Sequence, residues 1–405
     1  MSFGQGLSGL NAASRNLDVI GNNVANASTV GFKASDAIFS DVYANSLSSA
    51  SSTSSGIGVA VAAVQQQFVQ GTISTSSNPL DVAINGNGFF RMDTAGAITY
   101  SRNGQFHLDK DGYIVNVTGG KLSGYSVDSA GSIVASAPSP LQVSSGQLQA
   151  SMTTAAGIGL NLDSSKAAAV GAFDPTDSAT YNNSTSMAVY DSLGNSHTLA
   201  TYYAKTGANT WAVYGTFDGA TLPASLGTLT FKTDGTLDTT ATTLPFNVSQ
   251  ALTNGAATPF NFTLDYSKAT QFGSSFSVDT LSQNGYTAGL LSGYSISDDG
   301  ILQGQYSNGQ TRTLGQVALA RFTNVNGLQS LGNNEWRDSS ESGQAIIGPP
   351  GSSNFGVVQS GAVEESNVDL TKELVSMITA QRVYQANAQT IKTEDQMMNT
   401  LVNLR

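Results

Sequence analysis

Apolar residues recur with helical spacing at both ends of the chain and with a different spacing between them. Near the start, one apolar series repeats every seven residues and a second follows three positions later: Phe3, Leu10, Leu17 and Val24, then Ala13, Ile20 and Ala27. Two apolar positions per seven residues are typical of helices that pack as a coiled coil. We therefore predict a helical segment within residues 1–33.

The C-terminal end carries the same kind of repeat. Its main series is Leu370, Met377, Tyr384, Ile391 and Met398, with a more broken companion at Leu374, Gln381, Ala388, Asp395 and Val402. Asn367 and Asp369 are candidate caps, because their side-chain oxygens can accept hydrogen bonds from the free amides of a helix start. The two repeats predict a coiled-coil contact between the ends, with residues 1–33 and 361–405 forming one terminal helical domain.

Neither terminal helix is expected to hold itself in a lone subunit. Burying an apolar side chain gains roughly 1.5 to 3 kcal/mol, whereas fixing each backbone residue costs on the order of 1 to 2 kcal/mol. We therefore expect the ends to become ordered against other copies, through a subunit-assembly seam. Its expected members are Phe3, Leu7, Leu10, Leu17, Ile20, Val24, Leu370, Leu374, Met377, Tyr384, Ile391, Met398 and Val402. The alternative is two ordinary amphipathic helices that pack on the core of their own domain.

Between the ends, from about position 73, apolar residues alternate with polar ones. The run Ser186-Met187-Ala188-Val189-Tyr190 is one example. Eleven Asn-Gly or Asp-Gly pairs lie between Asn85 and Gly327, and each favours a tight hairpin turn. No long helical pattern interrupts them, which disfavours a parallel α/β sheet. The predicted fold class is mainly β with α-helical termini, in a nested, multi-domain chain with antiparallel β domains.

Breaks in these patterns divide the chain into nested segments. Gly31 reads as the stop of the first helix, and residues 34–72 follow as a connector. Within it, Ser46 to Ser55 consists almost entirely of serine, alanine and threonine, which predicts an extended, mobile stretch. The run from Ser132 to Gly157 contains two prolines and reads as a linker between two β bodies. We therefore assign residues 73–145 with 285–360 to an inner β domain and 146–284 to an outer β domain.

Composition and charge exclude several classes of function. The formal net charge is −11 and the chain has no basic stripe, so binding to nucleic acid is not expected. Without cysteine, neither disulfides nor thiolate metal sites are possible. The first residues lack the pattern of a signal peptide, in which a basic segment is followed by an apolar one. No window of the sequence is apolar enough for membrane insertion. We expect a protein that is cytoplasmic or exported by a route that leaves its N-terminus intact.

Residues for catalysis or metal binding are sparse. The two histidines, His107 and His197, form no cluster in sequence, and all six glutamates lie at position 335 or later. The run Asp109-Lys110-Asp111-Gly112 faintly resembles a calcium loop but lacks the closing glutamate, so a hairpin turn is the favoured interpretation. We predict no catalytic, cofactor-binding or metal-binding residues, and therefore no enzyme.

Two motifs resemble the bacterial flagellar axial proteins, the family of rod, hook and hook-associated subunits. The N-terminal motif runs from Ala25 to Lys33 and includes Ala25, Asn26, Thr29, Gly31, Phe32 and Lys33. The C-terminal motif includes Glu365-Ser366-Asn367-Val368-Asp369-Leu370 and Ala380-Gln381-Arg382-Val383-Tyr384. Within the family, the length and the long β insertion resemble the hook subunits, as do Phe89-Phe90-Arg91 and Ser360-Gly361-Ala362-Val363-Glu364.

The resemblance implies a structural subunit that polymerises into a flexible, tubular universal joint around an export channel. Such a hook transmits torque from rod to filament. The implied partners are other copies of the chain, rod proteins, the hook–filament junction protein, the hook cap and the type III export apparatus. The implied location is the flagellum, outside the cell. A rod or hook–filament junction subunit is the alternative within the family, and an exported β-rich enzyme or adhesin is the alternative outside it.

Overall fold

The computed structural model describes residues 3–42, 56, 58–128, 131–134, 136–144 and 146–403. The chain forms two compact units, one of residues 1–145, 293–305 and 311–405, the other of residues 146–292 and 306–310. A helix lies at each end of the described chain, and the regular elements between them are strands apart from one short 3₁₀ helix. The predicted fold class is therefore confirmed.

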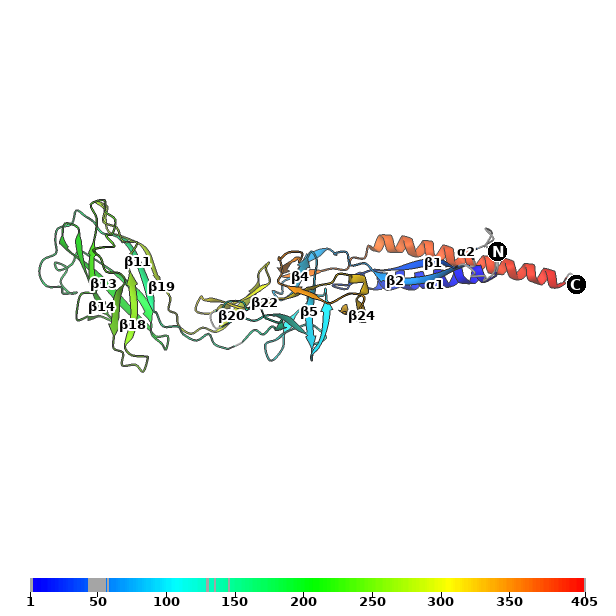
Figure 1. Ribbon diagram of the computed structural model, residues 1–405, viewed down its shortest axis with the longest axis horizontal. Helices are drawn as coiled ribbons and strands as arrows, with labels where there is room; N and C mark the ends of the chain where they lie inside the picture. The colour runs from blue at the N-terminus through cyan, green and yellow to red at the C-terminus, as the bar shows by residue number, and fades with distance from the viewer. Residues whose placement is uncertain are drawn as a thin grey trace. The chain divides into compact units, whose positions relative to one another are not determined.

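The two terminal helices lie side by side in opposite directions. Helix α1 (Phe3–Ala25) and helix α2 (Leu370–Asn403) are drawn in blue and red in Figure 1. Gly9 faces Asn387, and Gly6, nearer the start of α1, faces Ile391. The predicted contact between the two ends is confirmed. Because Gly6 already lies beside Ile391, the last turns of α2 run past the start of α1.

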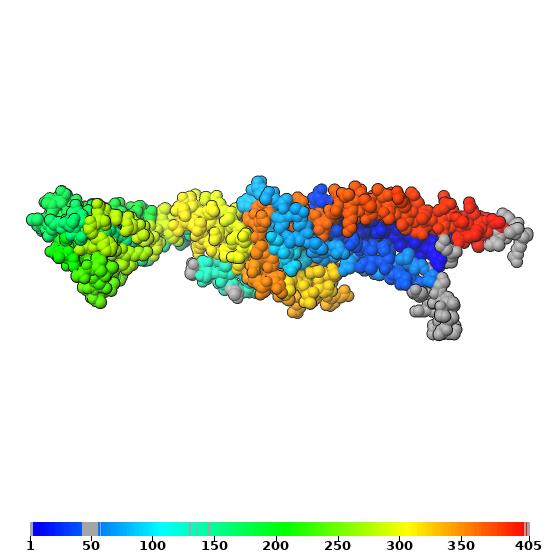
Figure 2. Space-filling view, turned by 90° about the horizontal axis from the view of Figure 1, so that it is seen from above, coloured from blue at the N-terminus to red at the C-terminus, as the bar shows by residue number. Residues whose placement is uncertain are grey.

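Residues 34–72 form more than a connector. Strands β1 (Ser35–Val42) and β2 (Gly58–Gln66) pair as an antiparallel hairpin. The hairpin is bonded to α1, since the Asn23 side chain exchanges two 2.9 Å hydrogen bonds with the backbone of Ser35. Figure 2 shows α2 lying along α1 and this hairpin. The serine-rich stretch Ser46 to Ser55 lies outside the described residues.

The chain leaves the helical end and returns to it through paired strands. Strand β3 (Ile73–Thr75) pairs with β28 (Ala362–Glu364), and β4 (Val82–Asn85) pairs with β27 (Val357–Ser360), both antiparallel. The outgoing and returning segments therefore run together. This pairing gives the nested connectivity that the sequence pattern predicted.

Beyond these pairs, the chain builds its largest sheet, of thirteen strands. The strands are β5 (Phe89–Thr94), β6 (Ala97–Ser101), β7 (His107–Leu108), β8 (Ile114–Val115), β9 (Lys121–Tyr125), β10 (Ser139–Pro140), β20 (Leu291–Ile296), β21 (Ile301–Tyr306), β22 (Thr311–Val317), β23 (Leu319–Arg321), β24 (Gln329–Gly332), β25 (Glu335–Arg337) and β26 (Ile346–Gly348). A short 3₁₀ helix, η1 (Val325–Gly327), precedes β24. The core includes Phe89, Tyr100, Phe322 and Trp336. Their rings pack edge to face, with distances of 4.8 to 5.9 Å between the ring centroids of contacting pairs.

Several Asn-Gly and Asp-Gly pairs occupy the predicted hairpin turns. Strands β7 and β8 are joined through Gly112, whose φ is 81°. In the same turn, the Asp109 carboxylate accepts hydrogen bonds from the amides of Asp111 and Tyr113 at 2.9 and 2.8 Å. The favoured interpretation of this loop, a hairpin turn, is confirmed, because its first aspartate holds the turn itself.

The second unit is a sandwich of two sheets. One contains β12 (Asn183–Tyr190), β13 (Ser196–Gly207), β14 (Thr210–Phe217), β15 (Ala220–Thr221) and β16 (Gly227–Thr230); the other contains β11 (Ala155–Asn161), β17 (Phe246–Gln250), β18 (Phe260–Asp265) and β19 (Ser277–Gln283). Side chains from both sheets share one core, with Trp211 and Leu199 from one sheet packed among Leu160 and Phe262 from the other. Alternating apolar residues on both sheets make this core. The unit is entered and left through neighbouring segments, since Ser151 and Tyr286 exchange backbone hydrogen bonds of 3.0 and 2.9 Å.

Candidate assembly site

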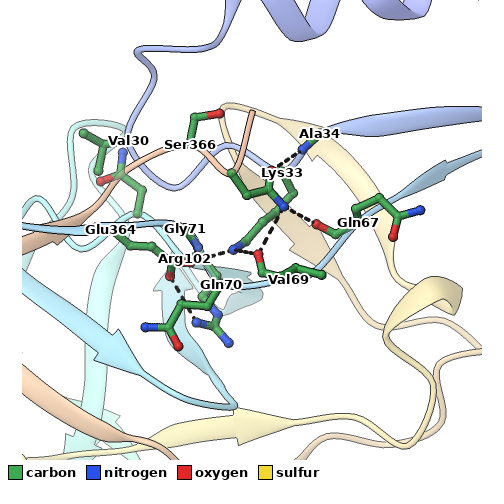
Figure 3. A network of polar contacts seen from close by, with 12 residues as sticks. Val30, Lys33, Ala34, Gln67, Val69, Gln70, Gly71, Arg102, Glu364 and Ser366 are labelled. Carbon is green, nitrogen blue, oxygen red and sulfur yellow. Dashed lines mark hydrogen bonds and ion pairs between the residues drawn. The ribbon is translucent and has the colours of Figure 1, made fainter. Parts of the chain in front are cut away.

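A buried charge cluster lies where the two ends of the chain meet the inner strands (Figure 3). The Glu364 carboxylate contacts Lys33 Nζ at 2.6 Å and an Arg102 guanidinium nitrogen at 3.0 Å. It also accepts a 2.9 Å hydrogen bond from the amide of Gly71. Lys33 and Glu364 have fully buried side chains, and Arg102 is 6% exposed. One carboxylate thus joins the N-terminal motif, the inner sheet and the returning strand β28.

The cluster holds two cations for one carboxylate. Burial lowers the pKa of Lys33 and of Arg102, and the nearby Glu364 offsets part of that effect for both. The remaining acceptors are neutral: Val69 O lies 2.8 Å from Lys33 Nζ, and Gly86 O lies 2.8 Å from Arg102. Removing Glu364 would leave both cations buried with carbonyl oxygens alone, which makes this carboxylate the central member.

The C-terminal motif adds a second, uncharged link beside the cluster. The Asn367 side chain accepts a 2.7 Å hydrogen bond from the amide of Ala34 and donates one of 2.7 Å to Gln67 O. Asp369 caps α2, since its carboxylate accepts hydrogen bonds from the amides of Thr371 and Lys372 at 2.9 and 3.1 Å. Of the two cap candidates, Asp369 is therefore the cap, and Asn367 instead joins the returning segment to the start of β1.

The N-terminal motif is a compact turn after α1. The helix ends at Ala25, so the prediction that Gly31 stops it is wrong. Asn26 accepts a 3.2 Å hydrogen bond from the Thr29 hydroxyl within the turn. Gly31 has φ of 72°, and a Cβ there would lie 2.6 Å from the amide nitrogen of Asn103. Glycine is required because the backbone conformation is left-handed and the inner sheet approaches closely. Phe32 then leads to the buried Lys33.

The two heptad series of α1 have different surroundings. The second series supplies Ala13 and Ile20, which are buried together with Gly6 and Ala12. The first series, which supplies most of the seam prediction for this helix, is less covered: Phe3 is 56% exposed, and Leu10, Leu17 and Val24 are half-buried. Leu7, also assigned to the seam, is exposed. Most of the predicted α1 seam therefore stays accessible in the single subunit.

The predicted seam residues of α2 are mostly uncovered as well. Leu370, Leu374 and Tyr384 are exposed, whereas Met377 and Ile391 are half-buried. Near the end of the helix, Met398 and Val402 are 62% and 70% exposed. The side of α2 that faces α1 includes one predicted seam residue, Ile391, which lies beside Gly6, and also Asn387, which lies beside Gly9. That other copies of the chain cover the exposed seam residues stays a prediction.

Sequence reasoning missed the residues that make the helices and the inner sheet fit. Glu364 and Arg102 were not assigned to a site, although a charged residue at the end of a β run is a signal in a chain in which only 11% of residues are charged. The glycines of α1 have a role that the heptad spacing does not indicate. A Cβ at Gly9 would lie 2.8 Å from the Asn387 side chain, and one at Gly6 would lie 3.1 Å from Ile391, so these glycines permit close approach of α2.

Among the residues that the structure describes, no group of three or more His, Asp or Glu side chains is placed to hold a metal ion. Neither α1 nor α2, over its described length, is long and apolar enough to cross a membrane.

Four family models match successive parts of the chain. They are described as flagella basal body rod protein (residues 5–33), flagellar hook protein FlgE/F/G D1 domain (83–165), flagellar basal body protein FlaE D2 domain (161–286) and flagellar basal body rod FlgEFG protein C-terminal (359–404). The two terminal models cover the motifs described above, and the other two cover much of the β region. Together they agree with the resemblance noted in the sequence.

Full-length relatives extend this similarity. The flagellar hook protein FlgE of Escherichia coli strain K12 is 44% identical over 412 residues, and that of Salmonella typhimurium strain LT2 is 44% identical over 414 residues; each match covers 100% of both chains. The same protein of Borreliella burgdorferi is 32% identical over 441 residues. A solved structure, Helicobacter pylori flagellar hook protein FlgE2, covers 72% of this chain with a TM-score of 0.55 at 14% identity, which is a likeness of fold.

Proposed function

The chain belongs to the bacterial flagellar hook protein family and is a structural subunit of the hook; from that premise we propose that its terminal helices form the contacts that hold the polymer together. The subunit is part of a homopolymer in the flagellum, outside the cell. The proposed contacts use the accessible members of the seam predicted from the sequence, whereas Ile20, which is 4% exposed, is buried within the subunit. No catalysis is involved.

One observation carries this proposal: both terminal helices keep large apolar side chains in contact with water. Phe3 and Leu7 on α1 are exposed, as are Leu370, Met398 and Val402 on α2. Burying exposed apolar surface gains roughly 25 cal/mol per Å², so large exposed apolar side chains that recur along both helices favour a protein contact. Covering these side chains by neighbouring copies would supply free energy that the lone subunit lacks.

We further propose the layers and partners that hook assembly requires. Residues 1–33 with 361–405 would form the wall around an export channel, residues 73–145 with 285–360 a middle layer, and 146–284 the outer layer. Rod proteins, the hook cap and the hook–filament junction protein would contact the ends of the polymer. The chain would leave the cell through the flagellar type III export apparatus, without a cleaved signal peptide.

Electron microscopy of the purified protein under polymerising conditions tests the seam. Leu7→Asp and Met398→Asp place a charge at exposed seam positions and should abolish tubes without unfolding the subunit. Leu193→Asp is the matched control, because Leu193 is 58% exposed but lies in the second unit. Tubes that form equally well in all three variants would overturn the proposed seam.

We also propose that bending is accommodated by the outer layer, through polar contacts that water can bridge and that exchange at little cost. Ser151 and Tyr286 are hydrogen-bonded neighbours, so residues 152–285 can be replaced by a short glycine linker. Polymers of this variant should form but should differ in curvature and bending stiffness from the wild type. Unchanged curvature and stiffness would remove the role given to the outer layer.

A further inference from the structure

An apolar groove lies between the two terminal helices and the β1–β2 hairpin. Its volume is about 610 Å³. Gly9 and Ala13 of α1 form one side, Val375 and Val383 of α2 the other, and Phe39 of β1 also lines it. None of the lining residues is charged. Val375, Val383 and Phe39 remain exposed, so the single subunit does not fill the groove.

The opposite side of α2 carries an apolar ridge, formed by Leu370, Leu374 and Ile378. These residues are four apart and therefore lie on one face of the helix. Each is about half exposed. Leu374 and Val383 are nine residues apart, which is two and a half turns at 3.6 residues per turn. The ridge and the groove thus face away from each other on the same helix.

We propose that the groove of one subunit receives the Leu370–Leu374–Ile378 ridge of a second copy. This inference rests on the proposed function and specifies the contact. A groove and a ridge on opposite sides of one element make a head-to-tail contact, in which each added copy presents a new groove. Such heterologous contacts continue indefinitely when they do not close into a ring, as an open tube requires.

The chemistry of both surfaces favours a second copy over other occupants. Aliphatic side chains fit a groove without charges, whose exposed members Val375, Val383 and Phe39 are themselves apolar. Every copy of the chain carries both the ridge of three side chains and, on the opposite side of α2, the groove, so a second copy always offers a ridge that can occupy it. The ridge lies nearer the start of α2 than most of the groove, so neighbouring copies would be staggered along the helix axis.

The absence of cysteine from the chain permits a direct test. In the variant Leu374→Cys/Val383→Cys, the two thiols of one chain lie on opposite sides of α2 and cannot reach the roughly 3.8 Å Cβ separation of a disulfide. Both positions are partly exposed, so cysteine should be tolerated. After polymerisation and mild oxidation, denaturing electrophoresis without reductant should show a ladder extending well beyond the dimer.

The matched control is Leu374→Cys/Gln381→Cys. Gln381 is seven residues from Leu374 and therefore lies on the ridge side. This variant should give at most a faint dimer. A ladder from the control and none from Leu374→Cys/Val383→Cys would overturn the proposal. Tubes of Leu374→Cys/Val383→Cys that give no ladder would overturn it as well, because the groove would then be empty or hold something other than the ridge. Failure of the wild-type chain to polymerise would instead contradict the proposed function.

Discussion

Replacing Glu364 by glutamine tests whether the buried charge cluster fastens the two ends of the chain. The change keeps the shape of the side chain but removes the charge that Lys33 and Arg102 share at 2.6 and 3.0 Å. Both cations then have only neutral acceptors: Val69 O, Gly86 O and the single amide oxygen of the glutamine. The new amide group also presents a donor where an acceptor is needed. Removing one partner of a buried ion pair costs about 3 to 5 kcal/mol.

Tryptophan fluorescence can follow each unit separately. The chain has two tryptophans, both buried, with Trp336 in the first unit and Trp211 in the second. In a Trp211→Phe background, the loss of stability should lower the urea midpoint of the first unit by about 1 M or more, given slopes of about 1 to 3 kcal/mol per M. In a Trp336→Phe background, the midpoint of the second unit should not change. Glu365→Gln is the matched control, because Glu365 is adjacent and exposed.

The outcome also depends on the charge balance of the cluster. Lys33→Met leaves one cation with one carboxylate, so it should destabilise the first unit less than Glu364→Gln does. The double variant should lose less stability than the two single losses combined, because the cation that glutamine leaves uncompensated is absent. A midpoint for Glu364→Gln equal to that of the exposed control, or strictly additive losses, would refute the reasoning.

Two further predictions concern a turn and a titrating contact. Gly31→Ala should destabilise the first unit by about 1 to 3 kcal/mol more than Gly96→Ala. Both glycines have positive φ, but only a Cβ at position 31 would meet backbone atoms, those of Asn103. Equal losses of stability in urea unfolding would contradict this. Burial alone would lower the pKa of His197, but hydrogen bonds to Asp218 and Asp191 raise it. The stability gained from these hydrogen bonds is present below the ordinary pKa near 6.5 and disappears as pH rises through the higher pKa of the folded state. The free energy of unfolding of the second unit should therefore fall by about 1 kcal/mol between pH 6 and pH 9. His197→Gln should remove this pH dependence, and an unchanged pH dependence in that variant would disprove the prediction.

The elements that sequence reasoning identified are those with a local cause. The terminal helices follow from the spacing of residues such as Ala13 and Ile20, and hairpin turns such as that at Gly112 follow from Asp-Gly pairs. The hairpin of β1 and β2 was assigned to a connector, because its strands flank a serine-rich stretch and pair across it. Its stability depends on α1, through contacts such as Asn23 with Ser35, which no local pattern indicates.

The charge cluster could not be derived from spacing. Lys33 and Glu364 are 331 positions apart in the chain. Their contact depends on β3 pairing with β28, which brings the returning segment beside the end of the N-terminal motif. The heptad pattern likewise located an apolar stripe on each helix but could not tell which side another helix of the same chain covers. That choice depends on Gly6 and Gly9, where small size permits contact.

The contacts within the subunit and those proposed between subunits differ in kind, and this difference bears on how a hook bends. The helical end is joined to the inner sheet by two pairs of antiparallel strands, by the ion pairs of Glu364, and by a 2.6 Å hydrogen bond from Trp336 to Gln66. Hydrogen bonds and ion pairs weaken steeply with changes in distance and angle, so they oppose twisting. The contacts proposed between the outer layers of neighbouring copies are polar and can be bridged by water, so they exchange at little cost when the copies move. We therefore expect bending to deform contacts between subunits before it deforms a subunit, while torque passes through each helical junction unchanged.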